Sequence, residues 1–425
     1  MIQDKTCNNK KSLSRFILLL ATVCFPLSVL AHAFGQRYDL PLPLNLYLWA
    51  AGAAVASSFI IVATLRVNIS SFTRCLELGK LMPFSQVHSI PLTRFLQLLS
   101  LALFFLVLTT GLFADQHPRQ NFAPVFVWVI WWVGFAYVSS FFGNLWDVLN
   151  PWHIIHRTLS WLWPSWSQPL LVYPGHAGGW PALVLFSCFA YLELISGIAH
   201  HPSTLAWLVV SYSLITLTGI RLFGCGIWLR HGEAFSITFG LMAQFAIFRS
   251  QNNSLQLRLP GAGLLQTENV SISTMLFVLL ILCTVTFDGF IETPLWSDIY
   301  TAVYTSFSPE TGLSHPLSPD TIQKLILSGA MLFFYSLFVG VYLAFCLLTS
   351  KLSTRYIGTI TIARQYVLSL LPIAIAYHLA HYLSYLLISG QLIIPILSDP
   401  LTLGWDLFGT ADYRINIGLI DAGDV

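Results

Sequence analysis

The stretch from Arg364 to Ser389, RQYVLSLLPIAIAYHLAHYLSYLLIS, limits the possible folds of this chain more than any other. After Gln365 it stays apolar for long enough to cross a bilayer, which takes roughly 20 residues of helix. Near its middle lie His378 and His381, which project from one face of a helix because they are three residues apart. Polar side chains inside a membrane are costly and usually face protein, so this pair predicts a functional site.

Composition extends this prediction to the whole chain. Of 425 residues, 56% are hydrophobic and 9% are charged, whereas a soluble domain has about 25% charged residues. The apolar runs are unbroken rather than alternating, which favours transmembrane helices over a β-barrel. The predicted fold is therefore an all-α, polytopic transmembrane helical bundle in a lipid bilayer. A net charge of +2 and the lack of a basic patch exclude a nucleic-acid partner.

The N-terminal segment, residues 1–31, has the pattern of a secretory signal peptide. Lys5, Lys10, Lys11 and Arg15 precede a short apolar core, and small residues follow it. Cleavage is expected before His32 or before Phe34, and the alternative is an uncleaved first helix. After the signal peptide we expect a single membrane domain, 32–425.

Eight spans are predicted, at about 44–65, 92–114, 122–142, 180–199, 204–223, 272–291, 325–349 and 366–388. The stretch 231–248 is short and begins with polar residues, so it is predicted to be an interfacial helix or a re-entrant one. The final residues, 389–425, are too polar to cross and form an outer tail.

Orientation follows from the excess of Lys and Arg in cytoplasmic loops. If the mature N-terminus is outside, twelve basic residues face the cytoplasm: Arg66, Arg74, Lys80, Arg94, Arg157, Arg221, Arg230, Arg249, Arg258, Lys351, Arg355 and Arg364. The outer segments hold four: Arg37, Arg119, Lys324 and Arg414.

This topology places four titratable residues in the outer half of the membrane: Glu193, Asp288, His378 and His381. Two imidazoles with a carboxylate suit Zn²⁺, Mn²⁺ or Fe²⁺, with His378, His381 and Asp288 as the predicted ligands. Such a metal activates a water molecule, and a carboxylate, Glu193 or Asp288, orients it or acts as general base. The expected reaction is hydrolysis of hydrophobic esters that enter from the bilayer.

Structural alternatives stay open for each residue. The histidine pair could simply bridge two helices, Asp288 could cap the end of its span, and Glu193 could bond a neighbouring hydroxyl. His32, as an N-terminal residue, offers an amine and an imidazole nitrogen, which together suit copper. A non-enzymatic transporter or copper-handling protein that uses the same His and Asp cluster is therefore the alternative function.

Two polar segments outside the spans are expected near the outer mouth of the site. The tail sequence DPLTLGWDLFGTADYR is predicted either to pack over the mouth as a loop or to act as a lid in which Asp406, Asp412 and Arg414 contact substrate. Arg37, in the segment after the signal peptide, is assigned the same substrate-binding role. His200 and His201 are predicted to lie in a solvated turn.

Several of these stretches together resemble one family, the bacterial polytopic membrane proteins known as fenitrothion hydrolases, which act on an organophosphorus triester. The matching pieces are His32 with GQRYDLPLP (35–43), FGNLWDVLNPW (142–152), GEAFSITFG (232–240), VTFDG (285–289), AYHLAHY (376–382) and GWDLFGTADYR (404–414). The resemblance implies a hydrolase, while the signal peptide and the charge bias predict the bacterial inner membrane with a periplasmic mature N-terminus. Family members continue past the DYR sequence into another hydrophobic helix, whereas this chain stops at Val425. Truncation or the loss of one span is therefore expected, and a homologous membrane subunit is an expected partner.

Overall fold

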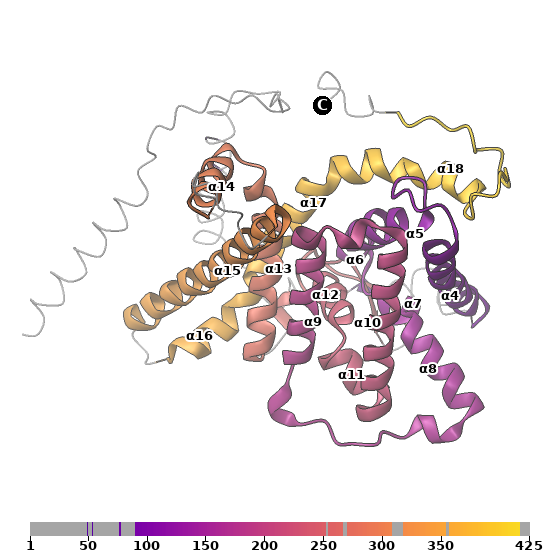
Figure 1. Cartoon of the computed structure of the whole chain (residues 1–425). Helices are drawn as coiled ribbons and strands as arrows, with labels where there is room; N and C mark the ends of the chain where they lie inside the picture. Colours follow the sequence, from indigo (N-terminus) through magenta and orange to yellow (C-terminus); the bar gives the residue numbers. More distant parts are fainter. Residues whose placement is uncertain are drawn as a thin grey trace, which may run out of the picture. The chain divides into compact units, whose positions relative to one another are not determined.

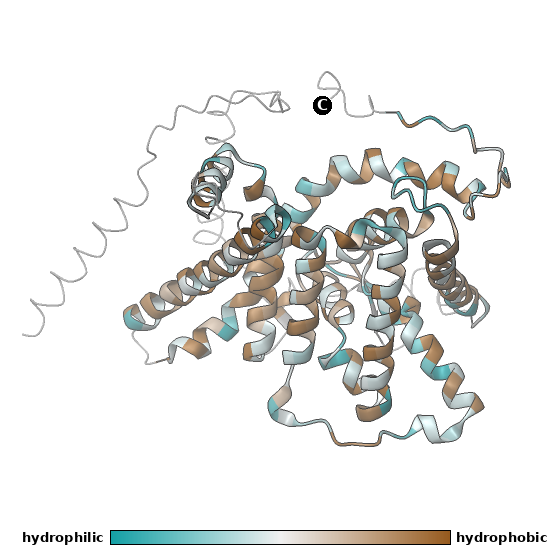
Figure 2. Cartoon of the chain, viewed as in Figure 1, coloured by the Kyte–Doolittle hydropathy of each residue, from teal (hydrophilic) through white to brown (hydrophobic). Residues whose placement is uncertain are grey.

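The computed structural model describes residues 90–251, 254–266, 270–307, 318–353 and 357–416, together with residues 49, 53, 76 and 77. Seven stretches of helix in this part are long and apolar enough to cross a membrane. Hydrophobic residues run along these helices, and hydrophilic ones gather at helix ends and in connections (Figure 2). The predicted all-α polytopic fold is confirmed, and the chain is a multi-pass membrane protein.

The seven stretches include four uninterrupted helices: α4 (Ile90–Phe113), α10 (Pro202–Phe223), α13 (Ile272–Ile291) and α15 (Pro319–Leu352). The other three are interrupted by changes of helical pitch. The first is α5 (Phe122–Pro124), η3 (Val125–Gly134) and α6 (Phe135–Phe142), and the second is η5 (Gly175–Ala177), α9 (Trp180–Tyr191) and η6 (Leu192–Ser196). The third is α16 (Thr359–Tyr366), η9 (Val367–Leu370), α17 (Leu371–Ser389), η10 (Gly390–Leu392) and α18 (Ile393–Ser398). They lie close to seven of the predicted spans. The signal peptide and the predicted span 44–65, apart from residues 49 and 53, lie outside the described residues.

Helix α13 lies at the centre of the bundle, between α15 and α9 (Figure 1). It is hydrophobic on every side, and most of its residues from Ser273 to Phe287 are buried. A helix that is apolar all round is stable only when other elements or lipid surround it. It also packs against α17, which brings Asp288 of α13 next to the histidines of α17.

Close packing of α4 against α10 depends on a glycine. A Cβ atom added at Gly111 would lie 2.7 Å from Cβ of Ala206 and 2.9 Å from the Pro202 carbonyl oxygen. Small residues at helix contacts allow backbones to approach closely, which is a general feature of membrane bundles. Helices α4 and α10 are therefore held at this point by backbone proximity rather than by large side chains.

Helix α12 (Ala234–Met242) follows α11 (Cys225–His231) and is buried in the bundle rather than placed on its surface. Its residues Phe235, Thr238, Phe239 and Met242 are all buried. The interfacial and re-entrant alternatives for 231–248 both stay predictions, and the burial of α12 among other helices favours the re-entrant one.

Glu233 forms the N-cap of α12, and its fully buried carboxylate holds this helix in place. It accepts hydrogen bonds from the backbone N–H groups of Phe235 (2.9 Å) and Ser236 (2.7 Å) and from the Tyr212 hydroxyl (2.6 Å). The Trp146 indole N–H also donates to it at 3.3 Å. These contacts bring together the segments 142–152 and 232–240, which lie far apart in the sequence.

The remaining elements connect these helices. Helices α7 (Trp146–Leu149) and α8 (Pro151–Leu162) follow α6, with the short turns η4 (Pro164–Ser167), η7 (Ile198–His200) and η8 (Leu264–Gln266) elsewhere. Helix α14 (Pro294–Phe307) was not predicted, because it is too short and polar to read as a span. A small antiparallel sheet of order β1-β3-β2 (Leu76–Glu77, Ser254–Leu257, Phe248–Gln251) was also not predicted.

Candidate functional site

The site begins with two π-helical segments, η3 and η6, that face each other. The Trp132 indole N–H of η3 donates to Glu193 Oε1 of η6 at 2.5 Å. A π-helical turn inserts an extra residue and so rotates the side chains that follow it, and such turns are frequent at functional sites. The pitch changes therefore set the directions of both Trp132 and Glu193.

A second carboxylate is held by two donors from α17. The Nε2 atom of His381 lies 3.0 Å from Asp288 Oδ2, and the Tyr382 hydroxyl donates to the same oxygen at 2.6 Å. Because an ionised carboxylate only accepts hydrogen bonds, Nε2 of His381 is the donor whenever Asp288 is ionised. Among the described residues, no donor reaches Oδ1 of Asp288, which leaves that oxygen for another partner.

Glu193 and Asp288 line the same cavity, which has a volume of about 250 Å³. Its walls come from η3, η6, η7, α13 and α17: Trp128, Trp132, Val133, Glu193, Leu194, His200, Asp288, Tyr382 and Tyr385. His200 is exposed, as predicted for a solvated turn, and it also lines the cavity. The cavity therefore reaches the surface where α10 begins.

The two predicted histidines differ in environment although they share one helix. His381 contacts Asp288, whereas His378 is only 1% exposed, and neither histidine is among the residues that line the cavity. The His378 ring packs edge-on against Trp132 and Tyr382, with centroids 5.8 Å and 4.8 Å apart. Its Nε2 atom has no hydrogen-bond partner within the described part of the chain. Of the two histidines, His381 is the one that forms a hydrogen bond with a carboxylate.

The metal prediction depends on three donors meeting at one point. Within the described ranges, no three His, Cys, Asp or Glu side chains are close enough together to hold a metal ion. Nε2 of His381 and Oδ2 of Asp288 are also bonded to each other. These residues alone do not form a metal site. His32 lies outside the described residues, so the zinc, manganese, iron or copper site stays a prediction.

The tail after α18 forms a hydrogen-bonded turn. Oδ1 of Asp406 accepts bonds from the Ser398 hydroxyl (2.9 Å) and from the backbone N–H of Ala411 (3.0 Å). The bond from Ser398 is the main reason that the pKa of Asp406 is lowered. The carboxylate thus supports the turn itself, while Asp412 and Arg414 are exposed. A substrate role for these three residues stays a prediction, and Arg37 lies outside the described residues.

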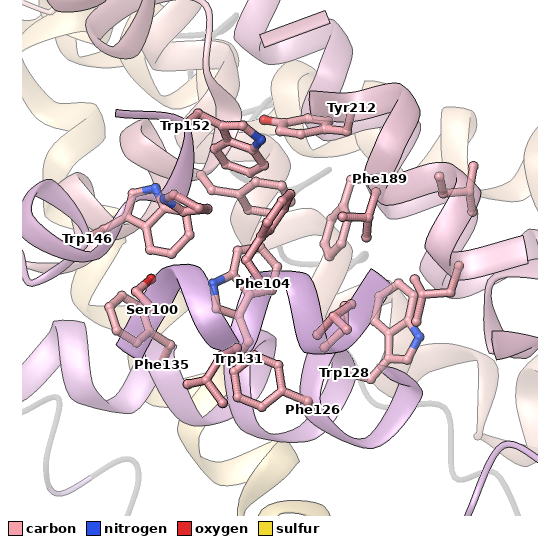
Figure 3. Close-up of a pocket in the computed structure, with 18 of the residues that line it drawn as sticks. Ser100, Phe104, Phe126, Trp128, Trp131, Phe135, Trp146, Trp152, Phe189 and Tyr212 are labelled. Atoms are coloured by element: carbon pink, nitrogen blue, oxygen red, sulfur yellow. The ribbon is translucent and has the colours of Figure 1, made fainter. Parts of the chain in front are cut away.

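A larger apolar groove lies beside the polar cavity and was not predicted. Its volume is about 460 Å³, and rings of Trp128, Trp131, Trp146, Trp152 and Phe189 point into it (Figure 3). Trp128 lines both the groove and the polar cavity. Sequence reasoning also missed Trp132, Tyr382 and Tyr385. The only signal for Tyr382 was its position directly after His381.

Comparison of the chain with protein-family models, with curated proteins and with solved structures found no match. The functional conclusions below therefore depend on the geometry of the site, and the resemblance to the fenitrothion hydrolases stays a prediction.

Proposed function

We propose that the protein is a membrane hydrolase of hydrophobic organophosphorus esters of the phosphotriester kind. The observation that carries this proposal is that two carboxylates, Glu193 and Asp288, line one cavity inside the bundle. Polar groups in a concave site with mostly apolar walls are typical of small-molecule sites. The resemblance to fenitrothion hydrolases supports the same reaction class.

Hydrolysis needs a base for water and a way to release the ester oxygen. Asp288 is the proposed base, because two donors hold Oδ2 in place and the described residues leave Oδ1 without a donor. Oδ1 takes a proton from a water molecule while the oxygen of that water forms a bond to phosphorus. The P–O bond to the leaving group breaks, and the leaving oxygen departs as an anion or takes a proton from Glu193. Positioned acid and base groups of this kind contribute about 10²–10⁴-fold to rates.

Placement in the membrane is part of the proposal. The excess of basic residues in one set of loops supports the bacterial inner membrane, with a cleaved signal peptide and a periplasmic N-terminus. The cavity then opens towards the periplasm, because His200 lies at the outer end of α10 in that topology. A hydrophobic substrate would reach it from the outer leaflet. A homologous membrane subunit is the proposed protein partner.

The direct test is turnover of a chromogenic aryl phosphotriester by the purified full chain in lipid vesicles. The double variant Glu193→Gln/Asp288→Asn should lose turnover by at least about 100-fold. Asp298→Asn is the matched control, because Asp298 is an exposed residue of α14. No turnover by the folded wild type, or equal turnover in the double variant, overturns the proposal. Proton-dependent flux without turnover would support the transporter instead, since intramembrane carboxylates also serve as proton relays.

A further inference from the structure

The apolar groove lies beside the polar cavity, and Trp128 lines both. We infer that the groove holds the single hydrocarbon chain of an amphiphilic phosphate ester whose head group lies in the polar cavity. This inference rests on the proposed function and names its substrate class as chain-bearing lipid-like esters rather than compact triesters.

The chemistry of the groove wall favours an apolar occupant. Its polar side chains mostly donate to groups of the protein itself: Trp128 to the Ala199 carbonyl (3.1 Å), Trp152 to Ser213 Oγ (2.9 Å), Tyr212 and Trp146 to Glu233 (2.6 and 3.3 Å), Ser211 to the Trp207 carbonyl (2.8 Å) and Ser100 to the Leu149 carbonyl. The rest of the lining is aliphatic or aromatic apart from the thiol of Cys188 and the indole N–H of Trp131. An apolar chain is therefore the ligand that such a wall favours.

The length of the groove fits one leaflet. Along α10 it extends from Leu205 to Ile215, which is roughly 15 Å at the rise of an α-helix. The hydrocarbon core of a bilayer is about 30 Å thick, so one leaflet accounts for about half of that. Ile215 and Leu99 line the groove and are 47% and 45% exposed on helices that span the membrane. A chain can therefore enter sideways from the lipid.

The polar cavity lies at one end of this groove, which is what an amphiphile requires. Ala199 lines the groove, and the next residue, His200, lines the polar cavity. Likewise, Leu192 lines the groove and Glu193 lines the polar cavity. These consecutive residues, together with Trp128, lie at the end where α10 begins. A chain in the groove would place its head group next to Glu193 and Asp288.

The test uses dodecyl dimethyl phosphate, an uncharged triester, with a diazirine at the chain end, added to the full protein in detergent and photolysed. Cross-links should map to groove-lining peptides of α4, η3 or α10 and disappear with excess plain dodecyl dimethyl phosphate. Val209→Trp, which fills the groove, should lower the yield at least about tenfold. Leu214→Trp on the same helix should not, because Leu214 is 62% exposed and does not line the groove. Thermal unfolding of both variants shows that they are folded.

Equal cross-linking in the two variants, or cross-links confined to outward faces of the bundle, overturns the inference. If Val209→Trp does not fold, competition and peptide mapping in the wild type still decide it. Turnover of a dodecyl aryl phosphotriester separates the two proposals. Groove cross-links without turnover contradict the hydrolase but not the binding site. Turnover that is equal in the folded Val209→Trp and Leu214→Trp contradicts the groove but not the hydrolase.

Discussion

Asp288 and His381 lie 93 positions apart in the sequence, yet Oδ2 of the carboxylate and Nε2 of the imidazole are 3.0 Å apart. The contact joins α13, the central helix, to α17. Tyr382 adds a second bond to the same oxygen at 2.6 Å. Two donors on one carboxylate oxygen fix the orientation of the group, and orientation is what a general base in a cavity needs.

The first prediction concerns those two donors. Tyr382→Phe and His381→Ala should each lower kcat for a phosphotriester by about 10-fold, with smaller changes in KM, because each loosens Asp288 rather than removing it. The double variant should lose less than the product of the two effects, since both act through one carboxylate. Steady-state kinetics of the four proteins give this comparison. Fully multiplicative losses would show that the donors do not share Asp288 as their target.

The second prediction concerns Glu233, which has no proposed catalytic role. Glu233→Gln places an amide where neighbouring donors need an acceptor, and this should destabilise the fold by at least about 2 kcal/mol. We expect a lower midpoint of thermal unfolding in detergent, whereas Asp298→Asn at an exposed position should leave it unchanged. An unchanged midpoint in Glu233→Gln would mean that the hydrogen bonds to the buried Glu233 carboxylate contribute nothing to stability.

Hydropathy was sufficient to predict the described spans, because a bilayer forces long apolar segments into helices. It could not predict the buried position of α12, since a short helix with a polar start has the same pattern on a surface or inside. The β1-β3-β2 sheet was not predicted because its strands are only a few residues long. A sequence pattern of apolar residues also does not show where a helix changes pitch, so η3 and η6 were not expected.

The candidate site shows the same limit. Depth along each span correctly placed Asp288 and His381 at a common level, because the rise per residue is constant. The rotation of each helix about its axis cannot be read from the sequence. For this reason Tyr382, the partner of Asp288, and Trp132, the partner of Glu193, were not predicted. The different environment of His378 was missed as well. Side-chain direction depends on pitch changes such as η3, which only the fold shows.

The third prediction tests the packing of α4 on α10. Gly111→Ala should lower the thermal unfolding midpoint, because the new Cβ would lie 2.7 Å from Ala206 Cβ and 2.9 Å from a backbone oxygen. The cost of such overpacking is typically about 1–3 kcal/mol. Gly329→Ala in α15 is the matched control, since nothing lies within 4 Å of its added Cβ. Equal midpoints in the two variants would contradict the close approach.

The fourth prediction concerns pH and His156 of α8, outside the spans. Burial lowers the pKa of His156, the bond between its ring and the Trp166 carbonyl opposes this shift, and the charge of His153 adds to it. The unfolded chain, with a histidine pKa near 6.5, therefore takes up the proton first as the pH falls. Stability should decrease below about pH 6.5 and level off below the folded pKa. His156→Gln should reduce this decrease, and the exposed His176→Gln should not. The check is the unfolding midpoint of the wild type and both variants from pH 8 to 5. Identical pH profiles of the wild type and His156→Gln would contradict the prediction.

The fifth prediction concerns metal removal. Because Nε2 of His381 and Oδ2 of Asp288 are bonded to each other and the His378 ring packs against Trp132 and Tyr382, turnover should survive dialysis against a chelator, and His378→Ala should not change the metal content of the purified protein. Elemental analysis and chromogenic turnover give both results. Activity that is lost on chelation and restored by added zinc, manganese or iron would instead support the metal-assisted mechanism predicted from the sequence.

The most direct measurement is kcat/KM for an aryl phosphotriester with wild type, Asp288→Asn and Asp288→Glu in the same vesicles. Asp288→Asn keeps the shape but removes the base, so kcat/KM should fall by at least about 100-fold. Asp288→Glu keeps a displaced carboxylate and should retain part of the activity. Wild-type values in a folded Asp288→Asn protein would contradict Asp288 as the base and, with it, the proposed mechanism.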